Sequence, residues 1–142
     1  MMEPVFFGSA SLRGKRVLIR CNLNVPLKQD GSIEKDTCIR ASIPTIRYVS
    51  SSGAKTILMG HLGNPHGRKK ACLSMIPVGN RISTLLGLSV RVLDNCVGRS
   101  VRIIVDKMQD GEIVLLENLR FNSGEEKNCS AFARQLSELG DL

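Results

Sequence analysis

Four short, continuously apolar runs are the feature of this sequence that most restricts its possible folds. They are Val17–Arg20, Thr56–Met59, Val90–Leu93 and Ile113–Leu116. A strand that alternates apolar and polar residues exposes one face to water, whereas a continuous run is typical of a parallel strand covered on both faces. The four runs therefore predict a parallel sheet buried between other elements.

Stretches with helical spacing separate these runs. Apolar residues recur three or four positions apart before a glycine in four places: Ile39, Ile43 and Ile46 before Gly53; Val78, Ile82 and Leu85 before Gly87; Val101, Val105 and Met108 before Gly111; and Phe132, Leu136 and Leu139 before Gly140. Each stripe predicts a helix with one apolar face, and each glycine suits a left-handed cap. Pro44 is expected to delay or kink its helix.

Strand and helix alternate four times, which predicts an α/β fold of three layers, a parallel sheet with flanking helices of the Rossmann-like class. The length of 142 residues fits one domain or part of a larger one. No apolar stretch approaches the ~20 residues of a membrane span. Residues 1–10 lack the basic head of a secretory signal. We therefore expect a soluble, cytoplasmic protein.

Charge and cysteine content narrow the class of partner. The formal net charge of +7 favours anionic partners, while one Tyr and no Trp offer few stacking platforms and argue against nucleic acid. Five scattered cysteines without a Cys-x-x-Cys pair argue against zinc and suit reduced thiols. A basic surface with no specific partner explains the charge equally well.

Polar residues gather where the predicted strands end. In open parallel sheets, ligands bind beyond the carboxyl ends of the strands, which here are the segments 21–26, 60–67, 94–98 and 117–121. These segments carry Asn22, Asn24, His61, Asn64 and Arg120, and the basic residues 68–70 follow. Amides, an imidazole and a guanidinium together predict a cradle for an anion.

Five stretches resemble the N-terminal domain of phosphoglycerate kinase, in that family's order and with similar spacing. They read VLIRCNLNVPL at 17–27, IRASIPTI at 39–46, GAKTILMGHLG at 53–63, DNCVG at 94–98 and LLENLRF at 115–121. The resemblance implies that residues 1–142 are a partial N-terminal domain that binds 3-phosphoglycerate. It also implies the family's glycolytic reaction, reversible phosphoryl transfer between 1,3-bisphosphoglycerate and ADP, with Mg-ATP or Mg-ADP held by a C-terminal domain.

Three positions depart from the family's pattern. Asn22 replaces the Asp of the motif Arg-x-Asp-x-Asn-x-Pro, which otherwise keeps its Asn as Asn24. Cys38 stands where the family has an arginine that contacts the substrate and the transferring phosphoryl group. Asn64 stands where it has the Arg of His-Leu-Gly-Arg-Pro. Losing such a cation resembles losing an arginine finger, worth roughly 10³–10⁵ in rate.

Several assignments stay open, and no catalytic or metal-binding residue is assigned. His61 either faces a phosphate or is a loop histidine bonded to backbone. Asn24 either contacts the substrate or caps the turn before the proline. Cys38 marks a lost arginine or is a reactive thiol. Arg40 cannot replace that arginine, because two residues along a helix is a rotation of about 200°. The run 125–127 is expected to be a solvated turn at the start of the last helix.

The departures and the length lead to three hypotheses. The chain has roughly a third of the family's length and no P-loop. We expect it to be inactive alone, with the nucleotide domain absent or supplied by a separate chain, and with weak affinity for 3-phosphoglycerate. One alternative is a non-catalytic pseudoenzyme or anion-binding module. The other is a fragment that leaves a sheet edge and apolar helix faces exposed and does not fold stably.

Overall fold

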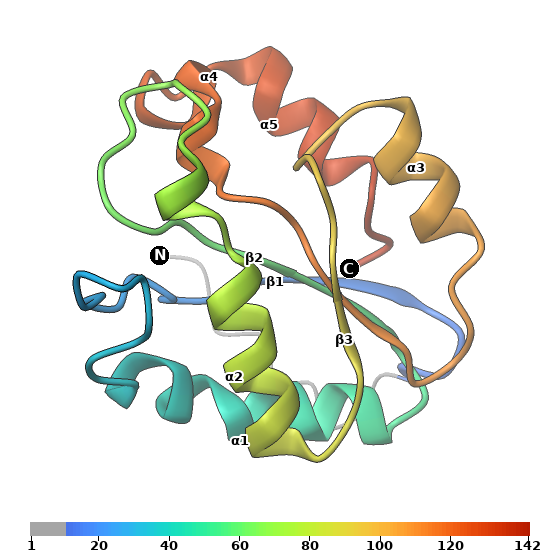
Figure 1. Cartoon of the computed structure of the whole chain (residues 1–142). Coiled ribbons are helices and arrows are strands. Elements are labelled where there is room, and N and C mark those ends of the chain that lie inside the picture. Colours follow the sequence, from blue (N-terminus) through green and yellow to red (C-terminus); the bar gives the residue numbers. More distant parts are fainter. Residues whose placement is uncertain (1–10) are drawn as a thin grey trace, which may run out of the picture.

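The strands form a single parallel sheet. The computed structural model describes residues 11–142, so the expectation about a signal at residues 1–10 lies outside it. β1 (Arg16–Arg20), β2 (Lys55–Met59), β3 (Val90–Val92) and β4 (Ile113–Leu115) pair in the order β1-β2-β4-β3, all parallel (Figure 1). The four predicted strands are confirmed, and each end differs from its expected position by no more than about one residue.

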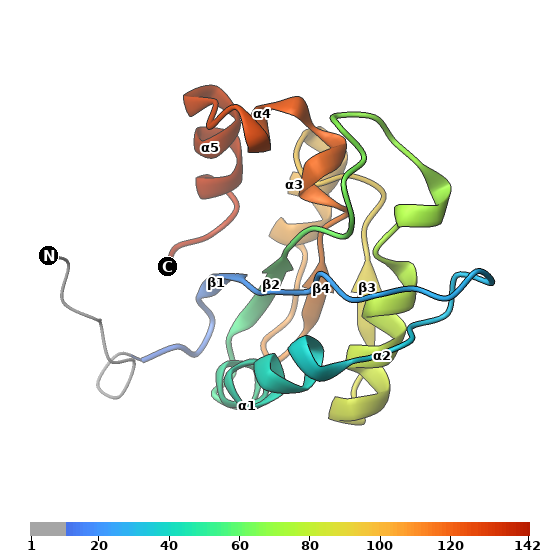
Figure 2. The same cartoon turned by 90° about the vertical axis from the view of Figure 1, so that its left-hand side faces the viewer.

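Helices cover both faces of this sheet. The predicted helices are α1 (Thr37–Ser51), α2 (Ile76–Leu86), α3 (Arg99–Asp106) and α5 (Ser130–Ser137). α1 and α2 pack on one face and α3 and α5 on the other, which gives the three-layer α/β architecture (Figure 2). Among residues 11–142, no helix combines the length and the apolar character needed to cross a membrane.

Three short elements that the sequence analysis did not anticipate lie at the carboxyl edge of the sheet. They are the 3₁₀ turns η2 (Ala71–Leu73) and η3 (Leu119–Phe121) and the short helix α4 (Ser123–Glu126). Elements this short contain no full period of apolar residues, so periodicity cannot reveal them.

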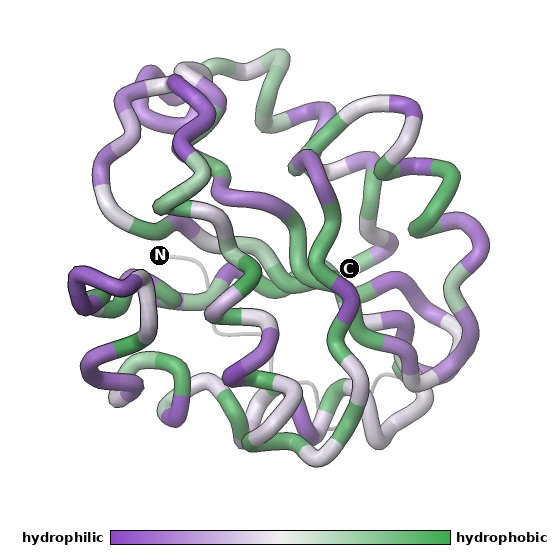
Figure 3. The backbone as a smooth tube through the Cα atoms, in the orientation of Figure 1, coloured by the Kyte–Doolittle hydropathy of each residue, from purple (hydrophilic) through white to green (hydrophobic). Residues whose placement is uncertain are grey.

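Each face of the sheet has its own core, because successive side chains of a strand point to opposite faces. Leu58 and Leu115 pack with α1 and α2, whereas Ile57 and Val114 pack with α3 and α5. Figure 3 shows these apolar strands surrounded by hydrophilic loops. Both β2 and β4 are buried on both faces, as the continuous runs predict, while Arg91 of the outer strand β3 is exposed.

Helix α1 runs through Pro44, so the expected delay is wrong. α1 begins at Thr37, and its buried residues Ile39 and Ile46 lie on either side of the proline. The proline cannot donate a hydrogen bond to the carbonyl of Arg40. Because both residues are exposed, water can satisfy that carbonyl and the helix continues.

Gly140 differs from the cap that the sequence predicts. Gly53 and Gly87 adopt positive φ of 81° and 69° after their helices, but Gly140 has no positive φ. A Cβ at position 140 would lie 3.0 Å from the Cβ of Leu18 in β1. Glycine is needed here because the chain passes close to β1.

Residues 141–142 then pair with the outer edge of β1. The N–H of Leu142 donates to the carbonyl of Arg16 at 3.2 Å, and the N–H of Leu18 donates to the carbonyl of Leu142 at 2.9 Å. Asp141 accepts from the backbone N–H of Arg16 at 2.9 Å and from its guanidinium Nη2 at 2.8 Å. This edge of β1 is thereby covered along Arg16–Leu18.

Candidate functional site

The loops that follow β1, β2 and β4 are tied directly to one another. The N–H of Gly63 donates to Asn24 Oδ1 at 2.9 Å, which joins the loop after β2 to the loop after β1. The N–H of Gly67 donates to the carbonyl of Arg120 at 3.0 Å, and the N–H of Leu119 donates to the carbonyl of Gly60 at 3.1 Å. The sequence-predicted residues on these loops therefore lie at one edge of the sheet, where the strands end.

Asn118 holds this edge from beneath. Its side chain is fully buried, and its amide nitrogen donates to the carbonyls of Leu62 at 2.8 Å and Leu73 at 2.9 Å. Its Oδ1 accepts from the backbone N–H of Arg120 at 3.0 Å. A buried amide with its hydrogen bonds satisfied fixes its neighbours firmly, so Asn118 sets the relative position of the loops that carry His61 and Arg120.

Glu117 is a buried carboxylate with a structural role. It is 5% exposed and accepts hydrogen bonds from the hydroxyl of Ser74 and from the backbone N–H groups of Met75 and Asn118, each at 2.8 Å. Met75 precedes α2, so this carboxylate satisfies a donor at the start of that helix. Its hydrogen bonds are thus used inside the protein.

Arg120 is the guanidinium at the centre of the edge. Its Nη1 donates to Asn64 Oδ1 at 2.6 Å, and its Nε donates to Glu125 Oε2 at 3.2 Å. The other oxygen of Glu125 accepts from Nη2 of Arg20 at 2.8 Å. We refer to Arg20, Asn64, Arg120 and Glu125 as the arginine cluster.

The expectation of a solvated turn at 125–127 is wrong for Glu125. This residue lies in α4, whose N-terminus is capped by Asn122, and its side chain is only 11% exposed. Burial alone would raise the pKa of the Glu125 carboxyl, but hydrogen bonds from Arg20 and Arg120 outweigh burial and hold the pKa below its ordinary value. Glu125 is therefore an ionised partner of both arginines.

His61 lies on the loop after β2, within the field of the arginine cluster. Burial, together with the positive charge of Arg120, lowers the pKa of its imidazole, so the ring is neutral at pH 7. A neutral imidazole offers one donor and one acceptor. Within residues 11–142 no protein group forms a hydrogen bond with this ring, so the alternative of a backbone-bonded histidine has no support there.

The two asparagines after β1 have different local contacts. Asn22 is exposed, and its Oδ1 accepts from the N–H of Asn24 at 3.3 Å, which makes Asn22 the residue that caps the turn. Asn24 instead accepts from Gly63 through Oδ1. Among residues 11–142 no acceptor contacts the side-chain NH₂ of Asn24, so this group can still donate.

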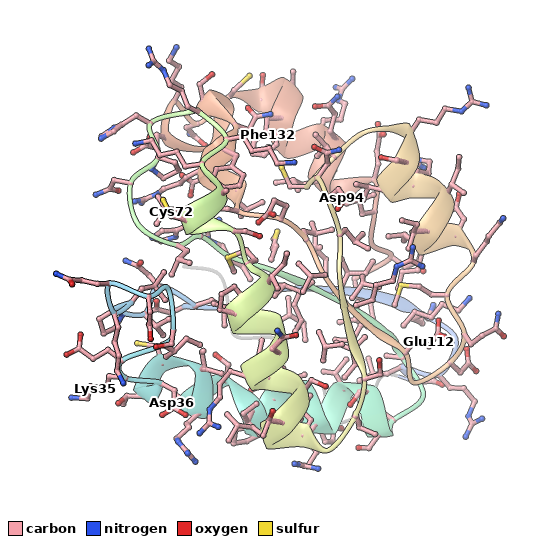
Figure 4. All side chains as sticks on the ribbon, in the orientation of Figure 1. Lys35, Asp36, Cys72, Asp94, Glu112 and Phe132 are labelled. Atoms are coloured by element: carbon pink, nitrogen blue, oxygen red, sulfur yellow. The ribbon has the colours of Figure 1, made fainter. Side chains whose placement is uncertain are left out.

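Cys38 and Arg40 lie at the start of α1. Cys38 is half-buried against the core between α1 and the sheet. Arg40 donates through Nε to Asp36 at 3.0 Å, and Arg81 of α2 binds the same carboxylate at 2.7 Å. Figure 4 labels Asp36 at this end of α1. Arg40 is thus engaged by Asp36 and does not join the arginine cluster.

The remaining predicted segments, 68–70 and 94–98, contact each other. Arg68, Lys69 and Lys70 are exposed, and Lys69 Nζ donates to the carbonyl of Asp94 at 3.2 Å. That contact connects the loop after β2 to the loop after β3. The segment 94–98 therefore adjoins the edge through backbone contacts, and it adds no cation to it.

The chemistry of the arginine cluster is that of an anion site. Residues 11–142 gather no group of three His, Cys, Asp or Glu side chains that could hold a metal ion. A cavity of about 300 Å³ lies next to the cluster, lined in part by Arg20, Glu125, Cys129 and Phe132. Two guanidiniums and a neutral imidazole supply donors that suit phosphate or carboxylate oxygens.

Arg20 and Glu125 were not among the residues predicted from sequence. Arg20 could have been identified from the sequence, because it ends the first apolar run and directly precedes the loop that holds Asn22 and Asn24. No sequence pattern could have identified Glu125, because its burial depends on the packing of α4 against η3 and α5. A short helix without an apolar stripe cannot indicate which of its acidic residues faces inward.

Comparison with known proteins gives one consistent result. The family model described as phosphoglycerate kinase matches residues 8–142. The phosphoglycerate kinase of Borrelia turicatae is 54% identical over 129 residues, which cover 91% of this chain and 33% of the relative. That of Acaryochloris marina is 50% identical over 134 residues, covering 94% and 33%. The chain spans about a third of the length of the curated relatives it matches.

Solved structures agree with this match. Phosphoglycerate kinase from Pyrococcus horikoshii OT3 is similar with a TM-score of 0.83 and 31% identity, over 95% of this chain and 34% of that one. Phosphoglycerate kinase from Coxiella burnetii is similar with a TM-score of 0.82 and 32% identity, over 95% and 33%. The parallel sheet and its flanking helices are therefore shared with these structures.

Proposed function

This chain belongs to the phosphoglycerate kinase family, and on that premise we propose that its carboxyl edge binds a small anion of the 3-phosphoglycerate type. The observation that carries the proposal is the arginine cluster, in which two guanidiniums meet beside a neutral imidazole. Arginine donates several hydrogen bonds in a planar fork that matches phosphate and carboxylate oxygens.

Each residue has a part in this proposal. Arg20 and Arg120 supply charge-assisted hydrogen bonds through the guanidinium N–H groups that Glu125 and Asn64 leave unused. His61 offers a ring N–H, and Asn24 offers its side-chain NH₂ to a ligand hydroxyl or carboxylate. The hydrogen bonds through Asn118 and Gly63 keep these groups in place without ligand, which lowers the entropy cost of binding.

We further propose that residues 1–142 alone do not transfer a phosphoryl group. Such transfers rely on positioning and on neutralising charge, and positions 38 and 64 carry a thiol and an amide instead of cations. Residues 11–142 gather no cluster of three His, Cys, Asp or Glu side chains for the magnesium ion of the family's Mg-nucleotide, and no step is assigned to that group. We also propose that a separate chain supplies the nucleotide-binding domain and that the protein acts in the cytoplasm.

An amide proton–nitrogen NMR titration of the purified chain with 3-phosphoglycerate tests the binding. We expect dispersed peaks, with shifts confined to the amides around Asn24, His61 and Arg120. Dispersed peaks that do not respond to millimolar ligand would refute the binding. A collapsed spectrum would support the hypothesis of an unstable fragment. A coupled assay with Mg-ATP should show no turnover, and measurable turnover would refute inactivity.

A second candidate function is a non-catalytic module for a different anion. The observation that favours it is the 2.6 Å hydrogen bond from Arg120 to Asn64, which occupies one of the donors that a phosphate would use. Shifts of the same amides with an acidic peptide, and none with 3-phosphoglycerate, would favour this module.

A further inference from the structure

The carboxylate of Glu125 accepts hydrogen bonds from two arginines, as the carboxylate or phosphate of a ligand would. Its Oε1 lies 2.8 Å from Arg20 Nη2 and its Oε2 lies 3.2 Å from Arg120 Nε. Its side chain is 11% exposed, compared with 50% for Arg20 and 26% for Arg120. The carboxylate thus lies beneath the two guanidiniums, whose outer parts reach solvent.

The backbone around Glu125 is firmly held. α4 packs against η3 and α5, and Figure 1 shows α4 next to α5. Gly124 is buried, and a Cβ there would lie 2.9 Å from the Cβ of Phe132 in α5. Asn122 Oδ1 accepts from the N–H of Gly124 at 2.8 Å. The backbone that carries Glu125 is therefore fixed by close packing and by a helix cap.

This carboxylate reduces the number of guanidinium N–H groups that the two arginines can donate to a ligand. One nitrogen of Arg20 and one of Arg120 donate to Glu125, and a second nitrogen of Arg120 donates to Asn64. Among the described residues, Nη2 of Arg120 has no protein partner. The formal charge of the cluster is one positive unit, because the carboxylate cancels one of the two guanidiniums, and His61 adds none at neutral pH.

We propose that Glu125 sets the selectivity of this edge among anions, because its negative charge weakens the binding of highly charged anions more than the binding of singly charged ones. A carboxylate monoanion presents only one negative charge to Glu125. A phosphorylated carboxylate presents about three negative charges near neutral pH, so Glu125 repels it more strongly than it repels a monoanion. The inference rests on the proposed function, in which this edge is the anion site, and it names the property that selects among anions.

The test compares two ligands on three proteins at pH 7.5. 3-Phosphoglycerate and D-glycerate share a three-carbon frame and a carboxylate and differ in the phosphate. Dissociation constants are measured by NMR for the wild-type chain, for Glu125→Gln and for Glu126→Gln. Glutamine keeps the size of the side chain and can still accept from an arginine. Glu126 is an exposed neighbour in the same helix, so Glu126→Gln controls for the change in net charge.

The expected result is a change in selectivity. Removing one negative charge a few ångströms from the ligand should tighten 3-phosphoglycerate binding about tenfold and glycerate binding about two- to threefold. Glu126→Gln should change either constant by less than about twofold, because exposed charges are screened. If Glu125 only positioned the arginines, Glu125→Gln would weaken both ligands.

The outcomes separate this inference from the proposed function. Wild-type binding of 3-phosphoglycerate with no tightening in Glu125→Gln overturns the inference and leaves the proposed function standing. Binding by the variant alone supports the inference and overturns the proposed function for the natural chain. Binding by neither protein overturns both. If Glu125→Gln does not fold, Arg20→Gln decides: the inference requires that it weaken 3-phosphoglycerate several times more than glycerate, and equal weakening overturns it.

Discussion

At position 64 a single amide changes what the neighbouring guanidinium can do. The sequence comparison with the family predicts that Asn64 removes a phosphate-clamping charge. In the structure its Oδ1 also accepts from Arg120 Nη1 at 2.6 Å. A cation at this position could not accept that hydrogen bond and would repel Arg120. The asparagine therefore adds no positive charge to this edge and also occupies one donor of Arg120.

The imidazole of His61 should titrate below its ordinary pKa of 6.5, because burial and then the charges of Arg120 and Arg20 oppose protonation more strongly than Glu125 and Glu126 favour it. The ring C–H signals, followed by NMR from pH 4.5 to 8, report the midpoint. Bound 3-phosphoglycerate should raise that midpoint, because a nearby anion favours the imidazolium.

Protonation of His61 also opposes folding. Since its pKa is lower in the folded chain than in the unfolded chain, its contribution to stability is complete above pH 6.5 and is lost as the pH falls through the lowered value. A midpoint at or above 6.5 in the ligand-free chain would contradict this account.

Residues on the loops after parallel strands could be placed together from sequence, because those loops meet at one edge. This reasoning predicted that Asn24, His61 and Arg120 lie at the same edge. It could not predict Glu125, since no local pattern shows that an acidic residue in a four-residue helix is buried under two arginines.

At the scale of elements, apolar patterning located every predicted strand and helix, because each must bury a face against the sheet. The failures have separate causes. Pro44 was misjudged because a proline in an exposed part of a helix loses a hydrogen bond that water can replace. The glycine at 140 was assigned to a cap, whereas its role is a close approach to β1.

The packing of α2 on the sheet depends on Gly79. A Cβ at this position would collide with Cγ2 of Val92 in β3 and touch Leu115 in β4, and a β-branched side chain has little freedom to move aside. Gly79→Ala should gain roughly 0.5–1 kcal/mol from helix propensity and still lower the free energy of unfolding by about 1–3 kcal/mol through overpacking.

Urea denaturation measures this change in unfolding free energy. Asn80→Ala, at the next and exposed position of α2, is the control for propensity alone and should leave stability unchanged or slightly raised. A Gly79→Ala protein as stable as Asn80→Ala would show that β3 can yield to the added methyl group.

At the scale of the whole molecule, the order of the strands in the sheet could not be predicted from the sequence. Four apolar runs of similar length do not indicate which pair is central, and only the burial of β2 and β4 on both faces distinguishes them from β1 and β3. The two cores that result are held together by this sheet, so contacts that cover β1 matter for the entire fold.

The contact between Arg16 and Asp141 should make stability depend on pH in a defined range. Hydrogen bonds from the Arg16 side chain and backbone lower the pKa of Asp141 to about 2 from an ordinary value of 3.8. Because the pKa is lower in the folded chain, the stabilisation is complete above pH 4 and is lost as the pH falls toward 2. Asp141→Asn should cost about 1 kcal/mol at pH 6, a modest value because the pair is partly exposed.

Urea denaturation at pH 6, 4 and 3 tests this dependence. The difference between the wild-type chain and Asp141→Asn should shrink as the pH falls, and a difference that stays constant would rule out the carboxylate charge as its source. Asp110→Asn, at an exposed position, controls for the change in net charge.

The pairing of residues 141–142 with β1 has a consequence for the order in which the chain folds. Arg16 and Asp141 are 125 positions apart. Closing a loop of that length costs chain entropy, and this entropy is lost before the contact can stabilise the fold. The β1–β2 ladder joins segments much closer in sequence, from Arg16↔Lys55 to Arg20↔Met59. The inner edge of β1 can therefore form early, while its outer edge waits for the collapse of the rest of the chain. The same strand takes part in both an early and a late event of folding.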